Sequence, residues 1–224
     1  MAEIQYKQPI YIQSKTQAKY SIIWLHGLGA DGSDFVPIVP ELQLKDDVRF
    51  VFPHAPIRPV TINNGYEMPA WYDIRGDDLA DKEDLDGISA SQEYLMKLIE
   101  QEQAQGIQFD NIIIAGFSQG GAVALYTLLR LPYKIGGCMA LSTYLPFMSN
   151  SKEEINQATT ETPIFWGHGS QDTVVPESLG NISINHLKEL GYNIESHSYP
   201  MAHSVCHEEI QDISQWIHQQ FYKN

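Results

Sequence analysis

The sequence predicts a protein of the α/β class, in which helices cover both faces of a mostly parallel central sheet. Short apolar runs alternate with longer amphipathic segments along the chain, which is the pattern of repeated strand–helix units. Several runs are continuously apolar, as at 112–114, and this is typical of strands buried on both faces. With 224 residues, 43% of them apolar, a single domain over residues 1–224 is expected.

Strands and helices can be assigned in order along the chain. The predicted strands are Ser21–Leu25, Val48–Phe52, Asn111–Ala115, Gly136–Leu141, Pro163–Gly167 and Asn193–Tyr199. The predicted helices are Asp84–Gln105, Gln119–Leu131, Pro176–Leu190 and His207–Phe221. Gly106 and Gly191 end the first and third helices because glycine readily adopts the left-handed terminating conformation, and Pro132 closes the second. The segment Ile4–Ile12 alternates and favours an antiparallel edge strand.

One segment, Arg58–Asp84, departs from this alternation. It is rich in turn-forming, aromatic and acidic residues and shows no clear periodicity. A long irregular stretch inside a compact domain is usually a functional loop. The sequence therefore predicts a flap-like excursion at residues 58–84.

The net charge of the chain limits the classes of partner that it can bind. The formal net charge is −14, with only 14 lysines and arginines, which argues against a nucleic-acid partner. The same charge opposes an anionic membrane surface, although it leaves open a transient membrane contact through an apolar patch. The two cysteines, Cys138 and Cys206, do not suggest a disulfide framework, and the N-terminal residues show no signal-peptide pattern. A cytoplasmic location is expected.

A nucleophile motif follows the third predicted strand. Gly116–Gly120 reads G-x-S-x-G, with a strand before it and a helix after it, the context that this motif requires. The serine, Ser118, would lie in a tight strand-to-helix turn with its hydroxyl raised above the sheet. The positive end of the following helix dipole would face the reacting group. Ser118 is therefore the predicted nucleophile.

A glycine-rich turn follows the first strand. Gly27, Gly29 and Gly32 match the dinucleotide-binding spacing, but the second strand runs into Pro53-His54 instead of ending in the acidic residue that such a site needs. The alternative is the H-G-x-G turn of α/β hydrolases, which supplies one donor to an oxyanion hole. Under that interpretation, the backbone N–H groups of Leu28 and Gln119 are the two donors.

A serine nucleophile needs a base and an orienting acid, which follow it in the order Ser, acid, His in α/β hydrolases. Asp172 lies in the turn after the strand Pro163–Gly167, and His203 follows the last strand, so both lie at carboxyl ends of strands. His168 is the competing base, but it is too near Asp172 in sequence to suit both roles. Asp172 and His203 are the predicted acid and base.

A cluster of metal-binding residue types lies in the same region. Its members are His197, His203, Cys206 and His207. Their spacing fits no structural zinc pattern. No metal and no cofactor are therefore expected.

With these motifs, the chain resembles the acyl-protein thioesterase/carboxylesterase branch of the α/β hydrolases, which is also called the lysophospholipase or phospholipase/carboxylesterase family. The resemblance extends over nearly the whole chain. The motifs that carry the resemblance are Leu25–Gly29, Pro53–Pro56, Met68–Asp73, Gly116–Gly121, His168 with Asp172–Pro176, and Met201–Ser204. It implies the α/β-hydrolase fold, with Ser118, Asp172 and His203 as a triad and Leu28 and Gln119 at the oxyanion hole.

The resemblance also implies an apolar channel for an acyl chain. Trp71, Leu79, Phe117 and Val175 are the positions expected to line it, although core packing is an equal alternative for Phe117 and Val175. The flap would surround this channel. Thr143 stands where the family usually has glycine, which puts the shape of its loop in question.

The expected activity is hydrolysis of a carboxylic ester or thioester by an acyl-enzyme mechanism. Two other functions compete with this one. A peptidase on the same fold would usually carry an additional screening domain, for which this chain has no length. A catalytically inactive binding protein for a lipid or an acylated partner would have no use for an intact triad. The sequence leaves open whether the substrate is an ester, a protein thioester or a lysophospholipid, and whether the chain forms a homodimer.

Overall fold

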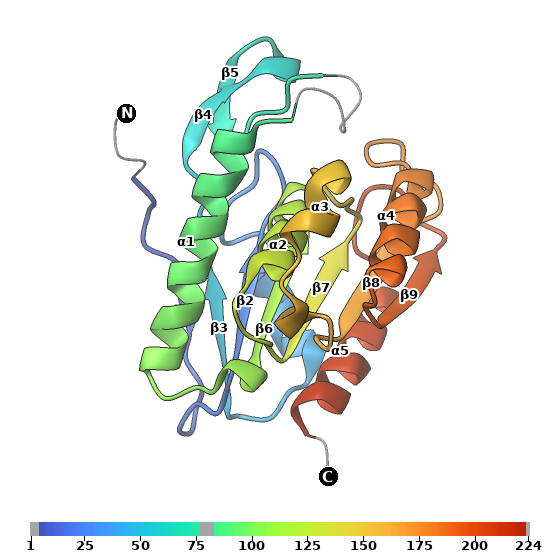
Figure 1. The fold of residues 1–224 in the computed structure, drawn as a ribbon. Coiled ribbons are helices and arrows are strands. Elements are labelled where there is room, and N and C mark those ends of the chain that lie inside the picture. Colours follow the sequence, from blue (N-terminus) through green and yellow to red (C-terminus); the bar gives the residue numbers. More distant parts are fainter. Residues whose placement is uncertain (1–4, 77–82, 223–224) are drawn as a thin grey trace.

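A seven-stranded sheet forms the centre of the molecule in the computed structural model, which describes residues 5–76 and 83–222 (Figure 1). Its strand order is β1-β3-β2-β6-β7-β8-β9. The strands are β1 (Ile10–Ile12), β2 (Tyr20–Leu25), β3 (Val48–Phe52), β6 (Ile112–Phe117), β7 (Gly137–Leu141), β8 (Ile164–Gly169) and β9 (Ile194–Tyr199). Only β1 is antiparallel to its neighbour, so the predicted α/β class and the antiparallel N-terminal edge are confirmed.

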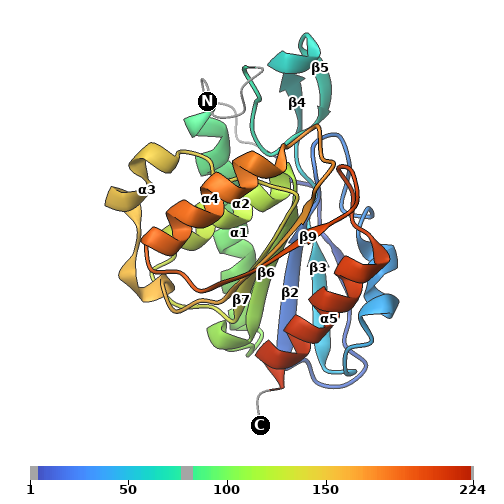
Figure 2. The same cartoon turned by 90° about the vertical axis from the view of Figure 1, so that its right-hand side faces the viewer.

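Helices cover both faces of this sheet. The helices α1 (Leu85–Ala104), α2 (Gln119–Arg130), α3 (Met148–Glu154) and α4 (Glu177–Glu189) lie on one side, while α5 (His207–Phe221) and the 3-10 turn η1 (Val36–Leu42) lie on the other (Figure 2). The buried apolar residues form two hydrophobic cores, and successive residues of β6 belong to them alternately. Ile112 and Ile114 belong to one core, and Ile113 and Ala115 belong to the other. Burial on both faces explains why this strand is continuously apolar. Within the described residues, no helix is long and apolar enough to cross a membrane.

The segment expected to be an irregular flap contains a hairpin, so that part of the expectation is wrong. β4 (Ile57–Val60) and β5 (Tyr66–Pro69) pair antiparallel and project beyond the carboxyl ends of the central strands (Figure 1). A 3-10 turn, η2 (Thr61–Asn63), joins β4 to Asn64-Gly65, where both residues have positive φ angles of 57° and 76°. Asn-Gly is a strong hairpin signal because both residues tolerate positive φ. Residues 77–82 of the predicted flap lie outside the described part of the chain.

A buried carboxyl group lies where α5 meets the sheet. Glu209, in the first turn of α5, is fully buried, and neither carboxyl oxygen has a hydrogen-bond partner among the described residues. A side chain at Gly167 of β8 would collide with this carboxyl group. The pKa of Glu209 is raised to about 8, chiefly by burial; the backbone amide of Cys206 opposes the rise, and the charge of Asp212 adds a smaller increase. Glu209 is therefore mostly protonated in the folded protein at neutral pH.

Replacing Glu209 with glutamine is expected to stabilise the protein increasingly as pH rises. Between about pH 4.5 and 8 the folded state holds a proton on Glu209 that the unfolded state has released, so the stability of the wild type falls as pH rises through this window. Glutamine does not titrate. Urea unfolding should show the gap in free energy of unfolding between Glu209→Gln and wild type widening by about 1–3 kcal/mol from pH 5 to pH 8. The exposed neighbour provides the control, since Glu208→Gln should show no such widening.

Candidate active site

Ser118 lies in a sharp turn between β6 and α2. Its backbone has a φ of 53° and a ψ of −119°. Residues other than glycine rarely adopt a positive φ of this kind. Two glycines allow the turn: a Cβ at Gly116 would collide with the backbone of Gly120, and a Cβ at Gly120 would lie 2.6 Å from the carbonyl oxygen of His26. This turn has the geometry of the nucleophile elbow that the sequence predicts, with Ser118 at the N-terminus of α2.

A carboxylate–imidazole pair lies at the carboxyl ends of β8 and β9, formed by the predicted acid and base. Nδ1 of His203 lies 2.6 Å from Oδ2 of Asp172. The second carboxyl oxygen of Asp172 accepts hydrogen bonds from the backbone N–H groups of Val174 and Val175 at 2.8 and 2.9 Å. The Asp172 side chain is fully buried, whereas that of His203 is 17% exposed. A buried carboxylate held in this way favours the tautomer of His203 with its proton on Nδ1, which leaves Nε2 free to accept a proton.

The aromatic ring of Phe117 also restrains His203. Their ring centroids lie 4.7 Å apart with the planes tilted by 46°. Phe117 precedes Ser118 in the chain, so the strand-to-helix turn itself packs against His203. The imidazole is thereby held from one side by a carboxylate and from another by the residue next to Ser118.

The turn after β2 is fixed by the ring of His26. Its Nε2 accepts the backbone N–H of Ala55 at 3.0 Å, so the proton must lie on Nδ1, which donates to the carbonyl oxygen of Gly27 at 2.7 Å. Burial lowers the pKa of His26 to about 4, which keeps the ring neutral and able to make both bonds at neutral pH. The carbonyl of Gly27 belongs to the same peptide unit as the N–H of Leu28, so His26 sets the orientation of the expected oxyanion donor.

These residues surround one cavity of about 240 Å³ at the carboxyl edge of the sheet. Most residues singled out from the sequence line it: Leu28, Phe117, Ser118, Gln119, Val175 and His203. Asp172 lies behind His203. The volume is slightly below the range of about 300–1,000 Å³ that is usual for small-molecule sites. The geometry therefore brings a serine hydroxyl, an oriented imidazole and two candidate backbone donors to one small space.

Several lining residues were not anticipated. Tyr72 and Ile74 come from the segment after β5, Tyr144 follows β7, and Val174 follows Asp172. The hydroxyl groups of Tyr72 and Tyr144 lie 2.9 Å apart in the cavity wall. The sequence did hold a signal for Tyr144, because β7 lies between the strands that lead to Ser118 and Asp172, and its carboxyl end must reach the same edge.

Trp71 differs from its expected role in the acyl channel. It is fully buried and is not among the residues that line the cavity. Its indole N–H donates to the carbonyl oxygen of His26 at 2.8 Å, and its backbone N–H donates to the side-chain oxygen of Gln119 at 2.8 Å. Gln119 also donates to the carbonyl of Tyr72 at 2.7 Å. Trp71 therefore ties the end of the hairpin to both halves of the expected oxyanion hole. Leu79, the other expected channel residue, lies outside the described residues.

The competing histidine, His168, lies near Asp172 but farther from it than His203 does, with its Nε2 3.7 Å from Oδ2 of Asp172. His168 is buried, with Nε2 2.8 Å from the carbonyl oxygen of Val175 and Nδ1 accepting the indole N–H of Trp166 at 3.4 Å. It does not line the cavity with Ser118. His168 instead braces the turn that carries Asp172.

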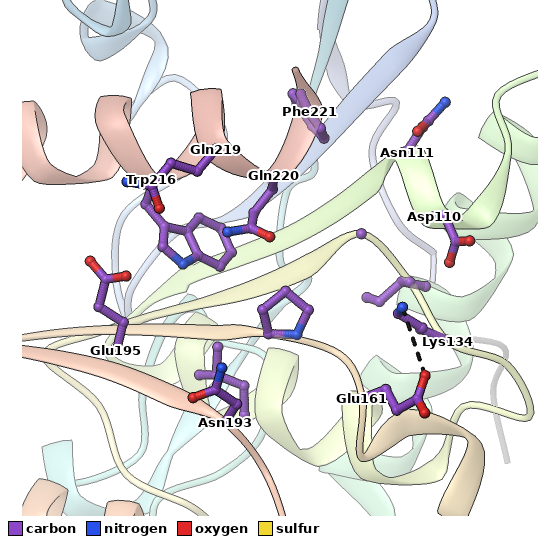
Figure 3. A pocket seen from close by; sticks show the side chains of 14 residues that line it. Asp110, Asn111, Lys134, Glu161, Asn193, Glu195, Trp216, Gln219, Gln220 and Phe221 are labelled. Atoms are coloured by element: carbon purple, nitrogen blue, oxygen red, sulfur yellow. Dashed lines mark ion pairs between the residues drawn. The ribbon is translucent and has the colours of Figure 1, made fainter. Parts of the chain in front are cut away.

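A larger cavity, of about 610 Å³, lies at the opposite end of the sheet (Figure 3). Trp216 and Phe221 from α5 face it, together with polar side chains such as Asn193 and Gln220. Lys134 and Glu161 form an ion pair across part of it at 3.9 Å. Among the described residues that line this cavity there is no serine, cysteine or histidine, so it lacks the serine and imidazole groups that the smaller cavity at Ser118 holds.

The sheet topology, the elbow and the strand-end acid–base pair define a serine hydrolase of the α/β-hydrolase class. The profile of the phospholipase/carboxylesterase family matches residues 7–221, and the chain belongs to that family.

Relatives and solved structures agree with this assignment. The chain is 39% identical to acyl-protein thioesterase 1 of Neurospora crassa, with 97% of this chain and 93% of that protein covered. It is 40% identical to acyl-protein thioesterase 1 of Saccharomyces cerevisiae, with 89% of this chain and 92% of that protein covered. The crystal structure of Arabidopsis thaliana SOBER1 matches with a TM-score of 0.86 at 33% identity, covering 91% of this chain and 99% of that one. The crystal structure of Zea mays acyl-protein thioesterase 2 matches with a TM-score of 0.86 at 27% identity, covering 96% of this chain and 100% of that one.

Proposed function

We propose that this protein removes acyl chains from thioester-linked cysteines of acylated proteins and also cleaves carboxylic esters, with Ser118 as the nucleophile. The observation that carries the proposal is the His203–Asp172 pair opening into the same cavity as Ser118. The lining is mainly apolar, with Phe117, Ile74 and Val175 among its members, which suits an acyl chain. The similarity to proteins named acyl-protein thioesterase 1 favours the thioester as the physiological bond.

The reaction proceeds in two halves. In the first, Nε2 of His203 takes the proton of Ser118, the serine oxygen bonds to the acyl carbon, and the backbone N–H groups of Leu28 and Gln119 stabilise the oxyanion. The carbon–sulfur or carbon–oxygen bond then breaks, and His203 returns its proton to the leaving group. In the second half, His203 takes a proton from water, the hydroxide bonds to the acyl carbon, and the carboxylic acid leaves as Ser118 recovers its proton.

The leaving group distinguishes the two substrate classes. A thiolate leaves more easily than an alkoxide, because the pKa of a cysteine thiol is about 8.5 and that of an alcohol is far higher. For two peptides of one sequence, acylated with the same chain on cysteine or on serine, we expect kcat/KM to be at least about tenfold higher for the thioester. A series of chain lengths from acetyl to palmitoyl would measure how much of the acyl group the cavity accommodates.

Ser118→Ala is the control for this comparison. Hydrolysis of both peptides should disappear in the variant, which shows that one site cleaves both. Cleavage of the serine ester alone would contradict the thioesterase proposal, and failure of the wild type on every chain length would contradict the hydrolase proposal as a whole.

A further inference from the structure

The loop after β7 places a hydroxyl group behind the nucleophile elbow. Thr143 is fully buried, and its Oγ1 lies 2.7 Å from the carbonyl oxygen of Ser118. A hydroxyl has a single proton, and the alternative acceptor, the carbonyl of Tyr144, is more distant at 3.5 Å. The Thr143 hydroxyl therefore donates to Ser118. Ser142, which precedes it, has a positive φ of 45°.

The acceptor has a particular place in the proposed mechanism. The carbonyl of Ser118 and the N–H of Gln119 belong to one peptide unit, and that unit is planar, so a bond that fixes the carbonyl also fixes the direction of the N–H. The same carbonyl accepts the N–H of Ala122 at 3.1 Å as the first bond of α2. A hydrogen bond accepted by a carbonyl also polarises the amide, which makes its N–H a stronger donor.

We propose that Thr143 is a positioning residue for the oxyanion hole, acting through the Ser118–Gln119 peptide unit. The other donor is held in the same way, since the ring of His26 donates to the carbonyl of the Gly27–Leu28 peptide unit. Each of the two N–H groups expected to bind the oxyanion thus belongs to a peptide unit whose carbonyl accepts a hydrogen bond from a side chain. The inference rests on the proposed function and adds Thr143 to the groups on which that function depends.

Local packing shows why threonine can occupy this position. Gly121, in the first turn of α2, lies directly against it, and a Cβ at residue 121 would come within 2.8 Å of the Cβ and Cγ2 atoms of Thr143. The absence of a side chain at residue 121 therefore makes room for the methyl group of Thr143. Valine has nearly the same shape as threonine and would fill the same space without the hydroxyl.

The test compares Thr143→Val with Thr143→Ser. Removal of the hydroxyl is expected to lower kcat for ester hydrolysis about tenfold, the order expected for one hydrogen bond, and less than the 10²–10³ typical when an oxyanion donor is lost. Both half-reactions pass through an oxyanion, so acylation and deacylation should slow together and KM should change by less than about twofold. Thr143→Ser should restore kcat because it keeps the donor.

Thr127 provides a matched control. Its hydroxyl is also fully buried, in α2, and has no hydrogen-bond partner among the described residues. Thr127→Val should leave kcat unchanged, whereas Thr143→Val should not. Thermal unfolding of all three variants would identify any effect that follows from loss of stability.

The outcomes separate the inference from the proposed function. If the wild type hydrolyses esters and Ser118→Ala does not, the proposed function stands. In that case, equal kcat values for Thr143→Val and Thr143→Ser, or a change confined to KM, would overturn the role of Thr143. A fall in kcat for Thr143→Val that Thr143→Ser reverses and Thr127→Val lacks would support it.

Discussion

Replacing Ser118 with alanine is expected to reduce kcat for ester and thioester hydrolysis by about 10⁴–10⁶-fold. The change removes the hydroxyl group that is proposed to form the acyl-enzyme, while the proposed oxyanion donors and the cavity walls stay in place. The residual rate should therefore be that of water attack on a bound substrate. Steady-state hydrolysis of p-nitrophenyl esters measures the loss, and the burst of p-nitrophenol that reports acyl-enzyme formation should vanish with it.

A second serine distinguishes this effect from general disturbance of the site. Ser142 is fully buried at the end of β7, and its hydroxyl has no hydrogen-bond partner among the described residues. Ser142→Ala should keep kcat within about threefold of the wild type, because no proposed step uses that hydroxyl. Equal activity of Ser118→Ala and Ser142→Ala would exclude Ser118 as the nucleophile.

Replacing Asp172 with asparagine is the second large change, with an expected fall in kcat of about 10³–10⁴-fold. One carboxyl oxygen accepts the backbone N–H groups of Val174 and Val175, so the amide oxygen of asparagine should take that place. Its NH₂ group would then face Nδ1 of His203 as a donor. The imidazole would move its proton to Nε2, the atom that must accept the proton of Ser118, and the base would be lost without a change in shape.

Hydrolysis kinetics together with the NMR signals of the His203 ring protons would test this account. The wild type should carry its proton on Nδ1 and Asp172→Asn on Nε2. Asp212→Asn serves as the control, because Asp212 lies on α5 and accepts the hydroxyl of Tyr199 at 2.9 Å instead of holding His203. A mild effect of Asp172→Asn, similar to that of Asp212→Asn, would mean that another group orients the base.

The central sheet was predictable because its strands are buried on both faces. A run such as Ile112–Ile114 can only be stable between two layers of helices, and the predicted bounds of β3 and α5 match the structure. The position of the candidate site follows from the same topology. Parallel strands end at a common edge, so the turns after β6, β8 and β9 must bring Ser118, Asp172 and His203 to one end of the molecule.

Contacts between segments distant in sequence were not predictable. Trp71 was expected in the acyl channel from the family resemblance and because its loop looked exposed, but its indole N–H donates to a buried acceptor 45 residues away. The hairpin before it was missed because its strands are short, although Asn64-Gly65 indicated a turn. Thr143 stood out only as a departure from the family, and its bond to Ser118 depends on the spacing of β6 and β7.

Covalent labelling with an alkyl fluorophosphonate shows whether Ser118 is a nucleophile activated by its surroundings. Intact-mass measurement after brief exposure should show one adduct per chain, and peptide mapping should place it on Ser118 within 116–121. The adduct should be absent from Ser118→Ala and should form much more slowly in Asp172→Asn. An unlabelled wild type, or an adduct on another residue, would contradict the account.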